Sequence, residues 1–349
     1  MIIRNIDLKK FIEGVKVVKS TKTKSVFLVI ENNKLYIEGN FETIKVKTII
    51  NCESGKNGVF HLNLEDLKPI MVLKNGTLEI NTDEKIFSIG NMNFTIQSLN
   101  EEDYKPIKKI NDNSQEITQK ELKYLLSCNY AVSDTDWKVM LQNINVDQGK
   151  FCALDGYRMS IKSTNKIFNN VTFNIKGQDI KVIDKLLKKN SNDIINVTRN
   201  NECVQFKINN IIVQCDFIQS EFVKYKSLIP DKKSFNTSIT VNTKEFLEII
   251  KTVYKMDKKA IFKMNITGEK INIGCLLDKG MNVYKNTINC KKTGKDLLIA
   301  FNPKYLLDIF KLQTADKTTI NFINEVSPAV VYGKNKDLDL VLPIRLANK

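Results

Sequence analysis

The residues best suited to catalysis are few and scattered along the chain. His61, the single histidine, stands between Phe60 and Leu62. Without a second histidine there is no Ser-His-Asp or His-metal arrangement that uses it, so a structural place on a strand is the better interpretation. Asp134 and Asp136 could hold Mg²⁺ with further carboxylates, but they follow an expected helix in a polar stretch typical of a loop. We therefore assign no catalytic residue and no metal ligand.

The remaining motifs do not indicate nucleotide or redox chemistry. No GxxxxGK[ST] or GxGxxG loop occurs, so a phosphate cradle is missing from the sequence. Asp155-Gly156 is first of all a turn dipeptide. The seven cysteines are scattered, odd in number and form no CxxC pair. That pattern favours reduced thiols in the cytoplasm over a zinc site, and no cofactor is expected.

The charge balance indicates a polyanionic partner. The chain has 54 lysines and arginines against 39 acids, a net charge of +15, and nucleic acid is the first candidate for a surplus of this size. A genome rich in Lys, Asn and Ile codons would give the same surplus, so composition alone leaves both explanations open. The lysines are spread along the chain, so any DNA contact would come from the folded surface. No apolar run of 18 residues and no secretory signal is present, so we expect a cytoplasmic protein without a membrane partner.

A threefold internal repeat must position these residues. Segments 3–19, 117–133 and 241–257 share one spacing of apolar residues. In the first segment these residues are Ile3, then Leu8 five positions later, then Phe11 and Ile12. This spacing predicts a short strand followed by a helix, with Asp7, Thr118 and Thr243 as candidate caps. A second pattern of the same kind, marked by Leu67, Ile180 and Leu306, follows roughly 60 residues after the first in each segment.

Alternating segments complete each repeat. Residues 34–39, 76–80, 204–209 and 270–274 predict strands, and Asn75-Gly76 is a hairpin-type turn dipeptide. The polar stretches 108–115 and 230–236 predict linkers. The chain is therefore expected to be an α+β protein with domains at residues 1–112, 113–232 and 233–349. Each domain should hold two helices and antiparallel sheets.

Three motifs on this repeat resemble those of bacterial DNA sliding clamps, the β subunit family of DNA polymerase III. Residues 154–160, Leu-Asp-Gly-Tyr-Arg-Met-Ser, are similar to the family's Thr-Asp-Gly-His-Arg-Leu segment. Residues 301–308 resemble its Phe-Asn-x-x-Tyr-Leu-Leu-Asp, and residues 341–346 its terminal apolar-Pro-apolar-Arg-Leu. The departures are Leu154 for Thr, Tyr157 for His, Val223 for Pro, Ser227 for a basic residue, and a basic overall charge where family clamps are acidic. They indicate a divergent member.

The resemblance implies three tandem clamp domains per chain, forming half of a six-domain ring. Such a homodimer encircles double-stranded DNA without reading its sequence and tethers the replicative polymerase. A clamp loader places it on DNA, and the clamp itself is no enzyme. Lysines lie off the apolar faces of the expected helices, and lysine suits contacts with phosphates that fix no base. The candidate DNA-binding residues from the helices are Lys9, Lys10, Lys120, Lys123, Lys181, Lys185, Lys251 and Lys304, and those carried over from the family's loops are Lys22, Lys24 and Lys138.

The resemblance also implies two protein-binding surfaces. In the family, short peptides of the polymerase and the loader dock into one apolar pocket. The matching residues are Leu141, Leu154, Gly156, Tyr157, Arg158, Met159, Leu228, Asn302, Tyr305, Val326, Pro328, Leu340, Val341, Leu342, Pro343, Ile344 and Arg345. The expected dimer interface holds Tyr104, Pro106, Ile107, Val253 and Tyr254.

Two other functions remain open at the level of sequence. A basic architectural protein could bind DNA with an open face. A metal-dependent nuclease would need at least three converging acids, which the repeat does not indicate.

Overall fold

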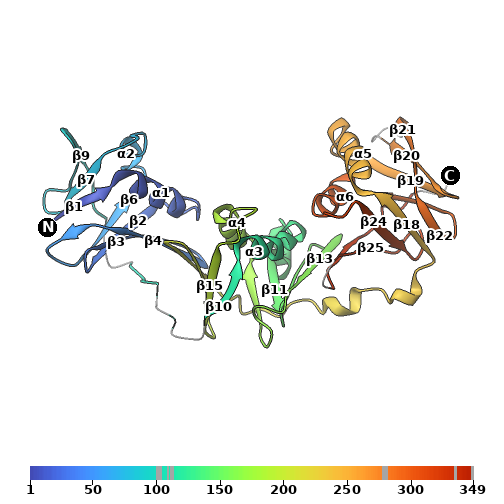
Figure 1. The fold of residues 1–349 in the computed structure, drawn as a ribbon, viewed down its shortest axis with the longest axis horizontal. Coiled ribbons are helices and arrows are strands. Elements are labelled where there is room, and N and C mark those ends of the chain that lie inside the picture. Colours follow the sequence, from blue (N-terminus) through green and yellow to red (C-terminus); the bar gives the residue numbers. More distant parts are fainter. Residues whose placement is uncertain (100–103, 108–109, 111–113, 277–281, 334–335, 347–349) are drawn as a thin grey trace. The chain divides into compact units, whose positions relative to one another are not determined.

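The structure is a computed structural model that describes residues 1–99, 104–107, 110, 114–276, 282–333 and 336–346 (Figure 1). Most of the predicted linker at 108–115 and the last three residues lie outside these ranges. By contacts the chain divides into two compact units. Unit 1 holds Met1–Lys123 and Ile175–Gln219, and unit 2 holds Tyr124–Asn174 and Ser220–Lys349.

The six predicted strand–helix pairs are confirmed. The first helix of each repeat is α1 (Leu8–Lys19), α3 (Gln119–Leu126) and α5 (Thr243–Met256), preceded by β1 (Ile2–Asp7), β10 (Gln115–Thr118) and β18 (Thr237–Asn242). The second helix is α2 (Lys68–Met71), α4 (Gly177–Leu186) and α6 (Pro303–Phe310). Before these helices come β6 (Gly58–Asn63), β14 (Thr172–Lys176) and β23 (Leu297–Phe301).

Two of the three predicted helix caps are confirmed, and the third is wrong by one residue. Asp7 accepts the N–H of Lys10 at 3.0 Å. Thr118 and Glu121 form a reciprocal capping box, with hydroxyl and carboxylate oxygens each accepting the other residue's N–H. In the third repeat Asn242 is the cap and accepts the N–H of Glu245 at 3.0 Å. Thr243 is already helical, and its buried hydroxyl lies 2.8 Å from that of Thr318.

Unit 1 is built from two antiparallel sheets. The five-stranded sheet runs β5 (Glu53–Ser54), β1, β7 (Thr77–Asn81), β8 (Ile86–Ile89), β9 (Met92–Thr95). The eight-stranded sheet runs β10, β15 (Ile194–Arg199), β16 (Cys203–Ile208), β17 (Ile211–Asp216), β4 (Ile44–Asn51), β3 (Lys34–Phe41), β2 (Ser25–Glu31), β6. Helix α1 packs on β3 and β4, so closely at Gly14 that a Cβ there would lie 2.8 Å from Ile37. The pairing of β17 with β4 joins strands of the first and middle repeats in one sheet.

Unit 2 also contains two antiparallel sheets. The larger runs β14, β11 (Asn143–Asp147), β12 (Lys150–Leu154), β13 (Arg158–Ser163), β26 (Leu338–Val341), β25 (Ala329–Tyr332), β24 (Lys317–Phe322), β18, β22 (Lys291–Gly294). The smaller runs β21 (Asn282–Asn289), β20 (Lys270–Leu276), β19 (Ile261–Thr267), β23. Helices α5 and α6 lie side by side (Figure 1) over a core that includes Phe246, Phe262 and Phe310. The pairing of β13 with β26 joins the middle and third repeats.

Because the middle repeat shares one sheet with each neighbour, the two compact units divide it between them. The three domain boundaries stay a prediction. Four short 3₁₀ helices complete unit 2: η1 (Ser127–Ala131), η2 (Asp136–Gln142), η3 (Tyr225–Leu228) and η4 (Lys232–Ser234), the last within the predicted linker at 230–236.

The predicted strands at 34–39, 76–80, 204–209 and 270–274 correspond to β3, β7, β16 and β20. The hairpin interpretation of Asn75-Gly76 is wrong, since this turn joins α2 to β7. Gly76 has a φ of +143°, and its carbonyl accepts the N–H of Leu8 at 3.2 Å. All seven cysteines are buried, and none of them forms a disulfide. None of the helices in the described ranges is long and apolar enough to cross a membrane.

Candidate functional site

An apolar cluster in unit 2 brings together part of the predicted peptide pocket. Leu141, Leu154, Met159 and Leu340 are buried in it, on η2, β12, β13 and β26. Four neighbouring apolar residues remain exposed: Tyr157 at 58%, Leu228 at 47%, Val139 at 61% and Met140 at 46%. We call these four residues, together with the buried cluster, the docking surface.

The C-terminal segment runs beside this surface. The N–H of Leu342 donates to the carbonyl of Tyr157 at 2.8 Å, and the N–H of Ile344 donates to that of Ala300 at 2.7 Å. Pro343 is half-buried and Arg345 is exposed, whereas Val341 belongs to the core of the third repeat. Val326 and Pro328 lie in the loop before β25, and Val326 is half exposed. Asn302 caps α6 by accepting the N–H of Lys304.

Two ion pairs fix the side chain of Arg158 at the edge of the docking surface. Its Nε donates to Asp155 at 2.8 Å, and its Nη1 donates to Asp308. The guanidinium lies 4.5 Å from the ring centre of Tyr305, whose ring is nearly parallel to that of Tyr157 at 6.0 Å. Arg158, Tyr305 and Tyr157 thus form one stack. Lys304 pairs with the same Asp308 at 2.6 Å, so its charge is partly balanced within α6.

A buried ionic network that the sequence analysis missed lies on β13 and β26. The Nζ of Lys162 contacts the two carboxylate oxygens of Asp339 at 3.0 and 2.9 Å, and both side chains are at most 2% exposed. Ser160, Tyr130 and Gln313 also donate to Asp339. The one signal for this network is alternation: Ser160 and Lys162 alternate with apolar residues, and so do Asp337 and Asp339.

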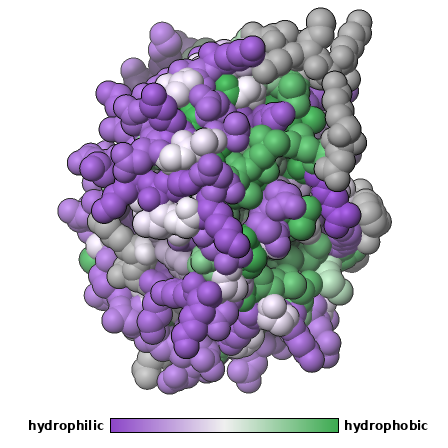
Figure 2. Space-filling view, turned by 90° about the vertical axis from the view of Figure 1, so that its right-hand side faces the viewer, coloured by the Kyte–Doolittle hydropathy of each residue, from purple (hydrophilic) through white to green (hydrophobic). Residues whose placement is uncertain are grey.

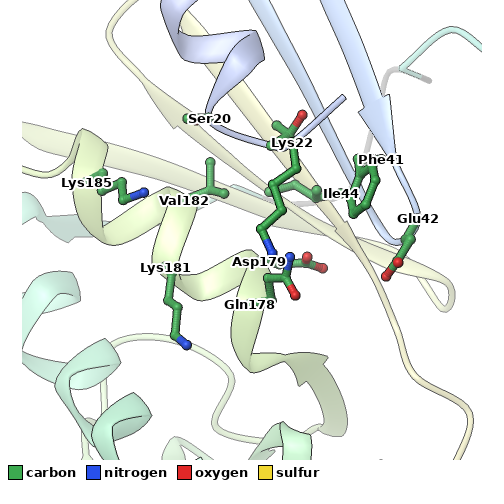
Figure 3. Close-up of a pocket in the computed structure, with 11 residues that line it drawn as sticks. Ser20, Lys22, Phe41, Glu42, Ile44, Gln178, Asp179, Lys181, Val182 and Lys185 are labelled. Carbon is green, nitrogen blue, oxygen red and sulfur yellow. The ribbon is translucent and has the colours of Figure 1, made fainter. Parts of the chain in front are cut away.

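In unit 1 a hollow of about 130 Å³ gathers three predicted DNA-binding lysines, Lys22, Lys181 and Lys185 (Figure 3). It lies between the end of α1, the β3–β4 turn and α4. Asp179 lines it, is 3% exposed and accepts the hydroxyl of Thr43 at 2.6 Å. Burial raises the pKa of Asp179 to about 6.

The other predicted DNA-binding lysines fall into three groups. Lys123, Lys251 and Lys304 are half-buried and paired with Asp184, Glu248 and Asp308. Lys123 also donates to the backbone carbonyls of Asp184 and Leu187, so it holds α3 against α4. Lys138 lies beside the Gly156 turn, in the peptide-pocket region. The exposed lysines are Lys9, Lys10, Lys24 and Lys120, together with the three at the hollow.

The predicted interface residues differ in what they can contact. Val253 is fully buried and packs α5 onto the core of unit 2. Tyr254 is half-buried, so it is the residue of this pair that can contact a partner. The hydroxyl of Tyr104 donates to Glu38 at 3.1 Å and its ring lies against Phe27, which anchors this segment on the eight-stranded sheet. Pro106 is exposed and Ile107 half-buried.

No group of three His, Cys, Asp or Glu side chains that could hold a metal ion occurs within the described residues. His61 is buried on β6 and stacks on Phe27 at 4.1 Å, in the structural place expected from its sequence.

Comparison with known proteins gives one consistent result. The family model for the C-terminal domain of the DNA polymerase III beta subunit matches residues 226–345. The beta sliding clamp of Bacillus subtilis is 24% identical over 77% of this chain and 75% of its own length. That of Staphylococcus aureus is 22% identical over 95% and 91%. The crystal structure of the Bacillus subtilis clamp aligns with a TM-score of 0.89 at 21% identity, covering 99% of this chain and all of that one. The Thermotoga maritima beta subunit aligns with a TM-score of 0.85 at 20% identity, with the same coverage.

Residues 226–345 thus match the C-terminal domain of the beta subunit family, and the whole chain has the fold of solved sliding clamps.

The departures from the family pattern have local structural consequences. Leu154, in place of Thr, is buried in the apolar cluster, and Val223, in place of Pro, packs against it. Tyr157, in place of His, extends the stack on Tyr305. The hydroxyl of Ser227, where a basic residue is usual, donates to the carbonyl of Lys224. These positions are therefore less polar than the family pattern.

Proposed function

We propose that this chain is a DNA sliding clamp that acts as a ring-shaped homodimer. It encircles duplex DNA and tethers the replicative polymerase for processive synthesis, with no catalysis of its own, in the cytoplasm. The observation that carries the proposal is the threefold strand–helix repeat on a fold that aligns over 99% of the chain with solved sliding clamps.

The distribution of charge supports a contact with the DNA backbone. Lys22, which follows α1, and Lys181 and Lys185, both on α4, line one hollow of unit 1 (Figure 3). Flexible ammonium groups attract phosphates at any sequence, so the ring can move along the duplex.

Ring closure by two chains is supported by open surfaces in the repeats at the two ends of the chain. Strand β9 is an edge of the five-stranded sheet, and Met92 on it is 47% exposed. An unpaired edge strand is a template for pairing with another chain. In unit 2, apolar residues gather on the end face that Figure 2 shows, and such patches mark docking surfaces. We propose that β9 and the segment 104–107 of one chain meet the third repeat of the other near Tyr254, head to tail.

The docking surface is the proposed site for short peptides of the polymerase and the clamp loader. Exposed Tyr157, Leu228, Val139 and Met140 each lie close in the chain to a residue of the buried apolar cluster. Apolar anchors of a peptide would gain most of their binding energy by covering these groups.

Retention on circular and linear DNA tests the main proposal. A closed ring loaded on nicked circular DNA should remain bound and leave after the circle is cut once. An open-faced architectural protein would bind both forms equally, and a nuclease would degrade them with Mg²⁺. Sedimentation should give a dimer; a monomer at micromolar concentration that stays monomeric on DNA contradicts the ring.

Peptide titration tests the docking surface. Removal of residues 342–349 deletes the segment that pairs with Tyr157 and Ala300, and should abolish binding of a peptide with Leu and Phe anchors. Leu228→Asp provides a second variant that leaves the backbone intact. Binding that survives both changes would place the partner site elsewhere.

A further inference from the structure

A buried carboxyl group lies at the hollow of unit 1, among its lysines. Asp179, on α4, is 3% exposed, and its Oδ2 accepts a hydrogen bond from the hydroxyl of Thr43 at 2.6 Å. Thr43 belongs to the turn between β3 and β4, so this hydrogen bond joins the first repeat to the middle repeat. Lys22, Lys181 and Lys185 line the same hollow (Figure 3). An anion that enters the hollow to reach the ammonium groups therefore also comes close to the carboxyl of Asp179.

The charges near Asp179 do not offset the cost of burying its own charge. Lys176 favours the ionised carboxyl, but it forms an ion pair with Glu42, which opposes ionisation, as does Asp216. Burial has the largest effect and raises the pKa of Asp179 to about 6. The titratable and charged groups around this carboxyl are Glu42 in the β3–β4 turn, Lys176 at the end of β14, Cys215 and Asp216 at the end of β17, Lys22 after α1, and Lys181 and Lys185 on α4.

Protonation of Asp179 and binding of a phosphate at the hollow favour each other. A bound phosphate and an ionised carboxylate repel, because both are negative. Protonation removes this repulsion and leaves the attraction of the lysines unchanged. Charges in a partly buried site are screened less than charges in open solvent, so the repulsion is felt across the hollow. Since the two equilibria are linked, the affinity for phosphate should rise as the pH falls through about 6.

We propose that the hollow holds a phosphate group of the DNA backbone together with a proton on Asp179, so that protonation of this carboxyl strengthens the contact with DNA and its ionisation weakens the contact. The inference rests on the proposed function, because it names how the phosphate contact of the lysines is regulated.

Binding to nicked circular DNA at pH 5.5 and pH 7.5, at constant ionic strength, tests the inference. Phosphodiester groups do not titrate in this range, so a change in affinity comes from the protein. For a pKa of about 6, the protonated fraction of Asp179 falls from about three quarters to about 3% between the two pH values. The intact protein should therefore bind about threefold to twentyfold more tightly at pH 5.5, with the upper value reached if phosphate binds almost only to the protonated form.

Two variants separate the carboxyl from the net charge. Asp179→Asn removes the charge and keeps an oxygen for the hydroxyl of Thr43. At both pH values it should bind DNA about as tightly as the intact protein does at pH 5.5. Glu116→Gln is the matched control, an exposed acid on β10 of the same unit. It changes the net charge by the same amount and should keep the pH dependence of the intact protein.

Equal affinity of the intact protein at both pH values would overturn the inference, as would a pH dependence that persists in Asp179→Asn. Weaker binding by Asp179→Asn at pH 7.5 would also overturn it, because loss of the repulsion can only strengthen the contact. An equal gain in Asp179→Asn and Glu116→Gln would show a response to net charge alone and contradict a local effect. If the intact protein is retained on circles at neither pH, the proposed function itself fails, whereas retention without pH dependence contradicts the inference alone.

Discussion

At the scale of single residues, the Lys162–Asp339 pair is the interaction most sensitive to substitution. Removing one partner leaves the other as a buried, uncompensated charge. Lys162→Met alone should therefore lower the free energy of unfolding by about 3–5 kcal/mol. The double variant Lys162→Met with Asp339→Asn should cost less than the sum of the single changes, because the new amide carries no charge and retains an oxygen for Ser160 and Tyr130. Denaturant unfolding, followed by the fluorescence of the single tryptophan, Trp137, measures the unfolding free energies of the single and double variants. A loss in the double variant equal to the sum of the losses in the two single variants would contradict the coupling.

Asp179 gives a residue-scale prediction that depends on pH. Its folded pKa of about 6 lies above the ordinary value of 3.8 because burial disfavours the charged form. A raised pKa in an acid means that the stabilising contribution is present below about pH 4 and is lost as the pH rises through 6. Asp179→Asn should therefore stabilise unit 1 at pH 7.5 by up to about 3 kcal/mol, while its oxygen still accepts from Thr43. Thermal melting at pH 4 and 7.5 tests this, and a gain of equal size at both values would disprove the titration.

The candidate site could be predicted from sequence only where a family motif carried it. Residues 154–159 and 342–345 are found through the resemblance, and the structure places the exposed Tyr157 next to Leu342. The positions of Lys138 and Tyr104 were not predictable. Each depends on a contact between residues far apart in the chain, Lys138 with Gly156 and Tyr104 with Glu38.

At the scale of elements, the cap of α5 offers a direct test of helix-start chemistry. Asn242→Ala removes the side-chain oxygen that accepts from Glu245 and should cost about 1 kcal/mol. Asn242→Gly should cost only a few tenths, because glycine is itself tolerated at this position. Denaturant unfolding of the two variants gives the comparison. Equal losses of unfolding free energy in the two variants would show that the Asn242 side chain does not stabilise α5 as a cap.

The elements themselves were largely predictable because apolar spacing is local. All six helices start close to the expected positions, although α2 is only four residues long. The cap error at Thr243 arose because two adjacent residues, Asn242 and Thr243, both suit the role. Periodicity gives no information on which strands become neighbours. The pairings of β17 with β4 and of β13 with β26, which merge the repeats, come from contacts more than 150 residues apart in sequence.

At the scale of the whole molecule, the lysines at the hollow of unit 1 allow a prediction of how salt and charge affect the proposed retention on DNA. Replacing Lys22, Lys181 and Lys185 with glutamate should weaken retention on circular DNA of any sequence. Each lysine–phosphate pair that the substitutions remove should reduce the dependence of log K on log salt concentration by about 0.9. Measurement of binding to nicked circles over a range of salt concentrations gives this slope.

The control must separate a local contact from the overall charge of +15. Lys270, Lys291 and Lys295 are exposed in unit 2 and outside the proposed DNA contact. Their reversal to glutamate changes the net charge by the same amount, so long-range attraction falls equally in both variants. If the hollow holds phosphates, only the Lys22, Lys181 and Lys185 variant shows a smaller salt slope. If the slope falls equally in both variants, the basic surplus acts as a diffuse field, and the lysines at the hollow have no special place in sliding.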